Sequence, residues 1–488
     1  MIKFHRNEII PVLILLLLSA IIWRHIPSLQ FQAEGFIYFT PSISAFYTSL
    51  PLPFDLFAKI VFNILPPLFN GQVFLYMWFL FIWMILTDAA FYLMVRVVTG
   101  STFVAILAAF IFILNYAGKY DMFSIGGYQY FVQRGAILLP QLFSFLSLSL
   151  YFYRGFIPKY YFLSLLIYNF SIIMGFFGTW LLPPFLLFPF FYLLFNLKKA
   201  KKFFWKIIWT PFPFLISNLL IIRQSGFIPE DSIFSFVLNN FLYTLKGILQ
   251  QLAVVTPPLG ELLKLFRKDS VQFEAILGLT IVLYCIAFIV IYKMDKILRV
   301  LAATALVSLI VILLLNVYLN ASNVLNTFGS SRYFYFPFTM VALFWGLFFY
   351  SLASKGRSYF VLLLIFCFLW LIYNVYRINE NLKVDAWIHK ANRETIDYVS
   401  RVSVKFNENS FVYLPANLGG WGQEFISRFY GKAGVKFSME IIEPLDLEKL
   451  VEQNFDPLNV YVLHYDPKKQ GVFDITNESR ERMRRLKQ

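Results

Sequence analysis

Charged residues, cysteines and histidines are all scarce in this chain of 488 residues, and each shortage excludes a class of protein. Only 14% of the residues are charged, whereas 59% are hydrophobic, a balance far more apolar than a soluble core requires. The four histidines are scattered, and Cys285 and Cys367 lie in apolar runs with no second ligand nearby. The sequence therefore indicates a protein of the bilayer, without a redox pair or a histidine-based metal cluster.

The net charge of +15 would suggest nucleic acid as a partner if the protein were soluble. The positive residues, however, collect in short loops between apolar runs and in the last hundred residues. We therefore expect no nucleic-acid partner, and we interpret the charge as a signal of membrane orientation.

Eleven apolar runs are long enough to be transmembrane helices, because a bilayer core of about 30 Å takes roughly 20 apolar residues per helix. The first run is followed by Arg24 and His25 instead of a small-residue cleavage site, so we expect an uncleaved helix there. The runs are 8–23, 73–98, 101–117, 136–153, 160–178, 180–197, 207–222, 272–292, 298–319, 334–352 and 358–376.

Every second loop between these runs is basic, and basic short loops stay on the cytoplasmic side of a membrane. The sequence therefore predicts a multi-pass protein of the cell membrane with its N-terminus in the cytoplasm and its C-terminus outside. The basic loop residues are Lys3, Arg6, Arg96, Arg154, Lys159, the run at 198–206, Lys293, Lys296, Arg299, Lys355 and Arg357.

The predicted outer loops are unequal in length, and they span residues 24–72, 118–135, 223–271 and 320–333. The first and third are long, semi-apolar and rich in proline and aromatic residues. Such segments are typical of amphipathic helices in the headgroup plane, so we expect them to roof the bundle formed by residues 1–376.

The composition changes after residue 376 to that of a small α/β domain, which we expect at 377–488 on the outer side. Residues 387–402 have the pattern of an amphipathic helix, and FVYLP at 411–415 that of a buried strand. NVYVLHYD and GVFDIT read as two more strands, joined by a turn at 466–469. The end of the chain, 480–488, reads as a basic surface segment, and PANLGGWGQEF at 415–425 as a turn or, alternatively, an acceptor-binding loop.

The outer loops carry the residues best suited to chemistry. The first offers Glu34, the second offers Lys119, Asp121 and Arg134, and the last offers Arg332 and Tyr333. A carboxylate and cations on one face suit the transfer of a group from a lipid phosphate to a hydroxyl. Glu34 would be the general base, while Arg332, with Arg134 or Lys119, would hold the phosphate.

Each of these residues also has a structural interpretation. Glu34 could be a solvated loop residue, Arg332 could reach to headgroup phosphates, and Lys119 could pair with Asp121. Asp88 lies inside the second run, where an ionisable residue is a functional candidate, although a structural partner on another helix is the preferred account.

The layout resembles the GT-C superfamily of membrane glycosyltransferases, which includes protein O-mannosyltransferases, aminoarabinose transferases of lipid A and oligosaccharyltransferases. The resemblance is carried by an acidic residue in AEGFIYF, two amphipathic segments, LMVRVVTGSTFVAILAAFIFIL, a late SSRYFYFPF and the small C-terminal domain. It implies a polyprenyl-phosphate-linked sugar donor and a lipid, glycan or protein acceptor on the outer face.

Many members have an aspartate, or an aspartate and glutamate pair, where this chain has Ala33 and Glu34. A divalent metal wants several oxygen ligands, and Asp121 is the one evident second donor, so we do not favour a metal cofactor. Two alternatives remain open: a catalytically silent GT-C-like scaffold or lipid-handling protein in envelope assembly, and a polysaccharide polymerase. A transporter is disfavoured because the runs contain too few charges for an ion route.

Overall fold

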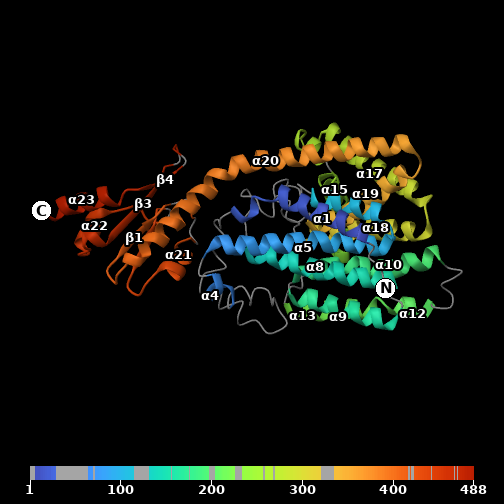
Figure 1. Cartoon of the computed structure of the whole chain (residues 1–488), viewed down its shortest axis with the longest axis horizontal. Helices are drawn as coiled ribbons and strands as arrows, with labels where there is room; N and C mark the ends of the chain where they lie inside the picture. Colours follow the sequence, from blue (N-terminus) through green and yellow to red (C-terminus); the bar gives the residue numbers. More distant parts are fainter. Residues whose placement is uncertain are drawn as a thin grey trace.

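The computed structural model shows a bundle of helices with a small sheet near the C-terminus (Figure 1). A helix occupies each of the eleven positions at which the sequence has a long apolar run. The structure describes residues 6–28, 64–69, 72–114, 131–154, 157–174, 176–196, 204–225, 233–256, 259–267, 270–319, 335–415, 418, 422–440, 442–466, 468–469 and 471–488.

The long helices of the bundle are α1 (Arg6–Ile22), α5 (Val73–Thr99), α6 (Thr102–Ile113), α8 (Phe131–Arg154), α9 (Pro158–Met174), α10 (Leu182–Phe195), α13 (Phe212–Ser225), α17 (Val271–Tyr292), α18 (Lys296–Leu319), α19 (Tyr335–Ala353) and α20 (Arg357–Val402). Five of them, α5, α17, α18, α19 and the first half of α20, are long and apolar enough to cross a bilayer. The chain is therefore a helical membrane protein.

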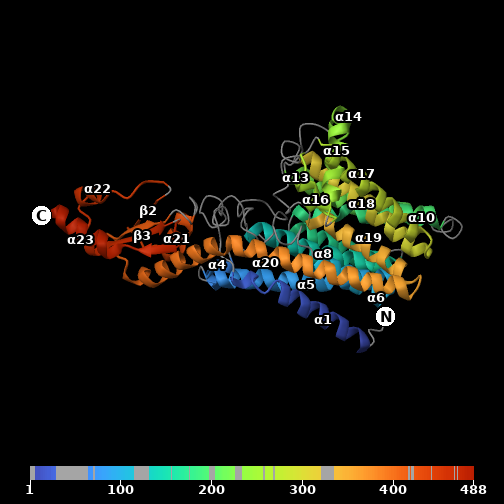
Figure 2. The same cartoon turned by 90° about the horizontal axis from the view of Figure 1, so that it is seen from above.

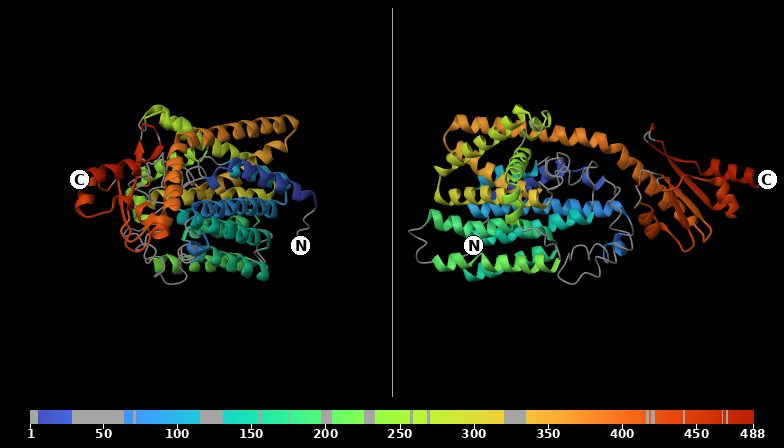
Figure 3. Two further views of the ribbon diagram at one scale, coloured as in Figure 1. Left: turned by 60° about the vertical axis from the view of Figure 1, so that its left-hand side comes forward. Right: turned by 180° about the vertical axis from the view of Figure 1, so that it is seen from behind.

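Shorter helices connect the long ones. They are η1 (Ile26–Ser28), α4 (Leu65–Phe69), η5 (Phe176–Leu181), α12 (Phe204–Trp209), α14 (Ile233–Asn239), α15 (Phe241–Val254) and α16 (Leu259–Lys264). The last three confirm the helices expected within 223–271. In two views α14 and α15 run across the axis of the bundle, and α14 projects beyond it (Figures 2 and 3).

The centre of the bundle is a row of packed helices, in which α8 contacts α5, α5 contacts α6, α6 contacts α19 and α19 contacts α18. Polar side chains link these helices across the apolar interior. Gln141 on α8 donates a 2.9 Å hydrogen bond to Thr339 on α19, and the hydroxyls of Ser144 and Ser171 lie 2.8 Å apart. Such interhelical bonds satisfy groups that lipid cannot satisfy, and so they fix helix pairs without a hydrophobic driving force.

Helix α20 runs along the outside of the bundle and continues into the C-terminal domain (Figures 1 and 3). Its 46 residues make it about 69 Å long at 1.5 Å per residue. The predicted domain boundary at 376/377 falls inside this helix, because the segment contains neither glycine nor proline to end it. The sequence thus changes from an apolar to an amphipathic pattern within one continuous helix.

The C-terminal domain is a four-stranded sheet with helices around it. Its elements after α20 are η8 (Ser403–Lys405), β1 (Phe411–Leu414), α21 (Gly422–Tyr430), β2 (Lys436–Met439), α22 (Leu447–Glu452), η10 (Pro457–Asn459), β3 (Val460–Asp466), β4 (Gly471–Asp474) and α23 (Thr476–Lys487). The strand order is β2-β1-β3-β4, with β1 parallel to both neighbours and β4 antiparallel to β3.

The strands expected from the sequence are confirmed, as is the turn between β3 and β4. The carboxylate of Asp466 accepts hydrogen bonds from the backbone N–H groups of Lys468 and Lys469, which closes that turn. The basic segment at 480–488 is more ordered than expected, because it forms most of α23. Met483 of that helix is fully buried against the domain core.

The domain is joined to the bundle by more than α20. One continuous cluster of buried apolar side chains includes residues of the bundle and residues of the sheet, among them Tyr76, Val412 and Phe425. Arg428 on α21 also lies close to Tyr76 near the start of α5. The domain therefore packs on the end of the bundle at which α5 begins.

Candidate functional site

The residues predicted for chemistry lie mostly outside the part of the chain that the structure describes. Glu34, Lys119, Asp121, Arg332 and Tyr333 all fall there. The backbone of Arg134 lies in the first turn of α8, and its side chain is outside the described part. The predicted meeting of Glu34 with Arg332 therefore stays a prediction.

Asp88 is the ionisable residue that the sequence places deepest in the bundle, and its side chain is almost fully buried. The hydroxyl of Ser19 on α1 donates to its carboxylate over 2.7 Å. This hydrogen bond gives Asp88 a partner on another helix, as the structural account of this residue requires.

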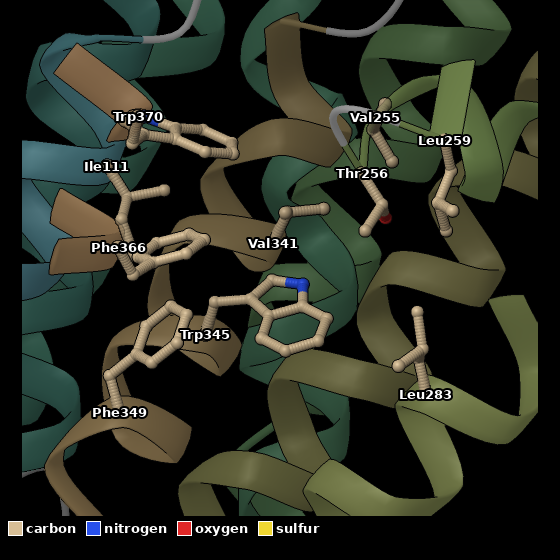
Figure 4. Close-up of a pocket in the computed structure, with 10 residues that line it drawn as sticks. All are labelled: Ile111, Val255, Thr256, Leu259, Leu283, Val341, Trp345, Phe349, Phe366 and Trp370. Carbon is tan, nitrogen blue, oxygen red and sulfur yellow. The ribbon is translucent and has the colours of Figure 1, made fainter. Parts of the chain in front are cut away.

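An apolar pocket of about 180 Å³ lies between five helices of the bundle. Aromatic side chains of α19 and α20 face aliphatic side chains from the α15–α17 region across it (Figure 4). An apolar cavity of about 150 Å³ in a soluble protein stays dry and admits a benzene-sized molecule, so this one has room for part of a lipid chain. Its lining is Ile111, Val255, Thr256, Leu259, Leu283, Val341, Trp345, Phe349, Phe366 and Trp370.

Three polar side chains form a hydrogen-bonded group at the wall of this pocket. The hydroxyls of Tyr284 and Thr256 lie 2.9 Å apart, and the indole N–H of Trp345 donates to Tyr284 over 3.3 Å. The group connects α17 with α19 and with the residues that follow α15. These hydrogen bonds fix the positions of the pocket walls relative to one another. The indole N–H of Trp370 is buried at the same pocket and has no hydrogen-bond partner within the described ranges.

Helix α15, which ends directly before the pocket residues Val255 and Thr256, is built with its polar side inward. Leu242 is 78% exposed, whereas Thr244, Gln250 and Gln251 are buried to 5% exposure or less. A side-chain oxygen of each of these three buried residues accepts no hydrogen bond from any described residue. Sequence reasoning missed this set, although Thr244 and Gln251 are seven residues apart, a spacing that places two residues on the same side of a helix.

An ion pair fixes α15 against the start of α17. The ammonium of Lys246 lies 2.7 Å from the carboxylate of Glu274, which stands in the first turn of α17. Because Ser270 caps α17 through the N–H of Phe273, this turn is well defined. The pair thus holds α15 across the helix ends, where charged groups meet water or headgroups.

The C-terminal domain has a polar groove of about 310 Å³ between its edge strand β2, β1 and α22. Two of the charged residues that line it form an ion pair, since Lys449 contacts Glu443 at 2.6 Å. At the carboxyl ends of the strands, His464 lies 2.8 Å from Glu440, so the two residues bridge β3 and the end of β2. The segment 415–425 contributes the start of α21 at Gly422, and most of the rest lies outside the described residues.

No group of three or more histidine, cysteine, aspartate or glutamate side chains that could hold a metal occurs among the described residues. No family model, curated protein or solved structure matches the chain. The assignment of a function therefore rests on the sequence and on the physical features of the described residues.

Proposed function

We propose that the protein is a GT-C-type glycosyltransferase that moves a sugar from a polyprenyl-phosphate-linked donor to an acceptor on the outer face of the cell membrane. The observation that supports this proposal is the apolar pocket lined by Trp345 and Trp370. A donor with a long hydrocarbon chain needs an apolar site between helices, and a transferase must hold that chain while its headgroup reacts.

The proposed topology has eleven transmembrane helices, a cytoplasmic N-terminus and the C-terminal domain outside. In this orientation α5 begins on the outer side, and the domain packs on that end of the bundle. The pocket residues Val255, Thr256 and Leu259 belong to the segment 223–271, which is then an outer loop. The pocket therefore opens in the outer half of the bundle, where an outer-leaflet donor arrives.

The proposed chemistry is a single displacement at the anomeric carbon of the donor sugar. The acceptor hydroxyl gives its proton to Glu34 as its oxygen bonds to that carbon, and the bond from the carbon to the phosphate oxygen breaks. The phosphate leaves on its polyprenyl chain, and Arg332 with Arg134 or Lys119 neutralises the charge that develops on it. Tyr333 and Asp121 would complete the substrate contacts, and the acceptor would be a lipid, glycan or protein.

The residue roles can be tested by measuring sugar transfer from a synthetic polyprenyl phosphate donor to an added acceptor. Glu34→Gln should reduce the transfer rate by roughly a hundredfold or more, because a positioned general base contributes 10²–10⁴. Arg332→Ala should weaken donor binding and also slow transfer. Full activity in both variants would remove these assignments.

The pocket can be tested with a matched pair of substitutions on α17. Leu283→Trp fills the pocket, whereas Val282→Trp places the same side chain at a neighbouring position that is 51% exposed. We expect the first variant to lose binding of a polyprenyl phosphate and the second to keep it. Equal binding by both would contradict the pocket, and binding without transfer in the unmodified protein would favour the silent, lipid-handling alternative.

A further inference from the structure

The buried side of α15 carries three polar side chains, each with an oxygen atom that lacks a hydrogen-bond partner among the described residues. Thr244 and Gln251 are seven residues apart and therefore lie on the same side of the helix, and Gln250 lies about 100° from Gln251 on the adjoining part of the buried surface. The exposed fractions of Thr244, Gln250 and Gln251 are 3%, 3% and 5%, so bulk water does not serve them. Each nevertheless has a side-chain oxygen without a hydrogen-bond partner in the described part of the chain.

Such a set is unusual because buried polar atoms in native proteins are almost always hydrogen-bonded. An unpaired amide oxygen is especially unfavourable in an apolar bundle. Hydrogen bonds are stronger in a low dielectric, so the absence of one costs more free energy there. Three such groups on one helix make the buried side of α15 the candidate for a binding site.

The chemistry of the three groups defines the kind of partner. An amide or a hydroxyl is neutral, and hydroxyl groups of a ligand can both donate to and accept from it. A phosphate would require a cation, yet the one described cation on α15, Lys246, is paired with Glu274. The set thus suits a neutral ligand with several hydroxyl groups.

The position of the set next to the pocket defines how that ligand is attached. The backbone N–H of Val255 donates to the backbone carbonyl of Gln251 over 3.0 Å, and Val255 and Thr256 line the apolar pocket. The backbone of Gln251 consequently lies one helical turn before the pocket residue Val255. One amphiphile can place its chain in the pocket and its headgroup against α15.

We propose that the inward side of α15, formed by Thr244, Gln250 and Gln251, binds the neutral, hydroxyl-bearing sugar of the lipid-linked donor. This inference rests on the proposed function and deepens it, because it makes the donor sugar a neutral hexose or pentose and assigns its recognition to α15. A donor sugar with an ammonium group is disfavoured, since no carboxylate on the inward side of α15 would pair with it.

The test compares the binding of three lipids to the full-length protein in detergent. Tryptophan fluorescence measures the binding, because Trp345 and Trp370 line the pocket. The three probes are a short polyprenyl phosphate, the same lipid carrying a neutral hexose, and the same lipid carrying an aminopentose. The unmodified protein should bind the hexosyl lipid roughly ten- to a hundredfold more tightly than the bare lipid, because each added hydrogen bond contributes about tenfold or less. It should bind the aminopentosyl lipid no better than the bare one.

The double variant Gln250→Leu with Gln251→Leu should lose that preference while it binds the bare lipid as before. Its melting temperature should be unchanged or higher, since leucine removes two unpaired polar groups. Thr304→Val on α18 is the control, because the hydroxyl of Thr304 is satisfied within its own helix by the carbonyl of Val300. Thr244→Val supplies a nearly isosteric second variant if the double variant does not fold.

The outcomes separate this inference from the proposed function. Equal affinity of the unmodified protein for the hexosyl and bare lipids would overturn the role of α15 while the pocket for the donor chain stands. A preference retained by a folded double variant, or tighter binding of the aminopentosyl lipid, would also overturn it. Binding of none of the three probes would contradict the proposed function itself.

Discussion

The hydroxyl of Ser19 donates a 2.7 Å hydrogen bond to the carboxylate of Asp88, and this bond joins α1 to the middle of α5. Both residues are buried, at 0% and 1% exposure, in a bundle whose other long helices present few charges. Since an ionisable residue inside a membrane bundle is expensive unless it has a partner, the pair explains how Asp88 is tolerated there. It also positions the first helix of the chain against the bundle core.

Ser19→Ala should lower the stability of the protein by about 1–3 kcal/mol, because it leaves a buried carboxylate oxygen without this donor. Asp88→Asn keeps an acceptor oxygen for Ser19, so it should cost less than Asp88→Leu. Thermal melting in detergent, with the folded fraction measured by size-exclusion chromatography, gives these differences in stability. Ser149→Ala is the matched control, since Ser149 bonds only the carbonyl of Phe145 in its own helix among the described contacts.

Tyr284→Phe should loosen the pocket. The change removes the bond to Thr256 and leaves the indole N–H of Trp345 without its acceptor, for an expected loss of about 1–2 kcal/mol. The corresponding control is Tyr350→Phe, because the hydroxyl of Tyr350 makes no hydrogen bond to the described residues. Melting curves of both variants decide the matter, and equal melting temperatures would show that the Tyr284 bonds do not hold the pocket walls.

The positions of the long helices could be predicted from the sequence because apolar runs of bilayer length have few other structures available. Three of the four strands of the C-terminal domain could be predicted for a similar reason, since short runs such as FVYL are bounded by turn residues, whereas β2 was not predicted. The boundary at 376/377 could not, because a helix continues wherever no residue stops it, and the change in polarity inside α20 does not stop it.

The candidate site was less predictable than the fold. The prediction of Glu34 and Arg332 rests on their charge, their place in predicted outer loops and the GT-C resemblance, and both lie outside the described residues. The pocket was missed because its lining comes from five helices that are far apart in sequence. In addition, its apolar lining residues cannot be distinguished by composition from the other apolar residues of the chain. The inward side of α15 was missed because the amphipathic pattern of 241–254 indicates a helix but not which side faces the protein.

The second half of α20 is tied to the last helix by Tyr398, whose hydroxyl lies 3.0 Å from that of Thr476. Burial raises the pKa of Tyr398 to about 12, from the ordinary value of 10.0. Because the folded protein then holds this proton more tightly than the unfolded chain, the associated stability is complete below pH 10 and is lost as the pH rises through 12.

Tyr398→Phe should therefore lower stability at neutral pH by about 1 kcal/mol, through loss of the bond to Thr476, and should reduce the further loss in alkali. Hydrogen exchange of β3 and α23 at pH 8 and pH 11 measures both effects in the full-length protein. An alkaline loss of the same size in the variant would assign that loss to other groups.

Helices α6 and α19 meet at Gly346, where an added Cβ would lie 2.6 Å from the Cβ of Ala108 and 2.9 Å from its Cα. Contacts this short leave no space for a methyl group, so Gly346→Ala should push the two helices apart and lower stability by about 1–3 kcal/mol. Gly278 on α17 provides the comparison, since nothing lies within 4 Å of the position of its added Cβ.

Gly278→Ala should leave the melting temperature unchanged or raise it, because alanine favours a helix over glycine by about 1 kcal/mol. The two substitutions are chemically identical, so the difference between their melting temperatures isolates close packing from helix propensity. If Gly346→Ala melts as high as Gly278→Ala, the helices are not in contact at Ala108. In that case the α19 wall of the pocket, which includes Trp345, would not be held by α6.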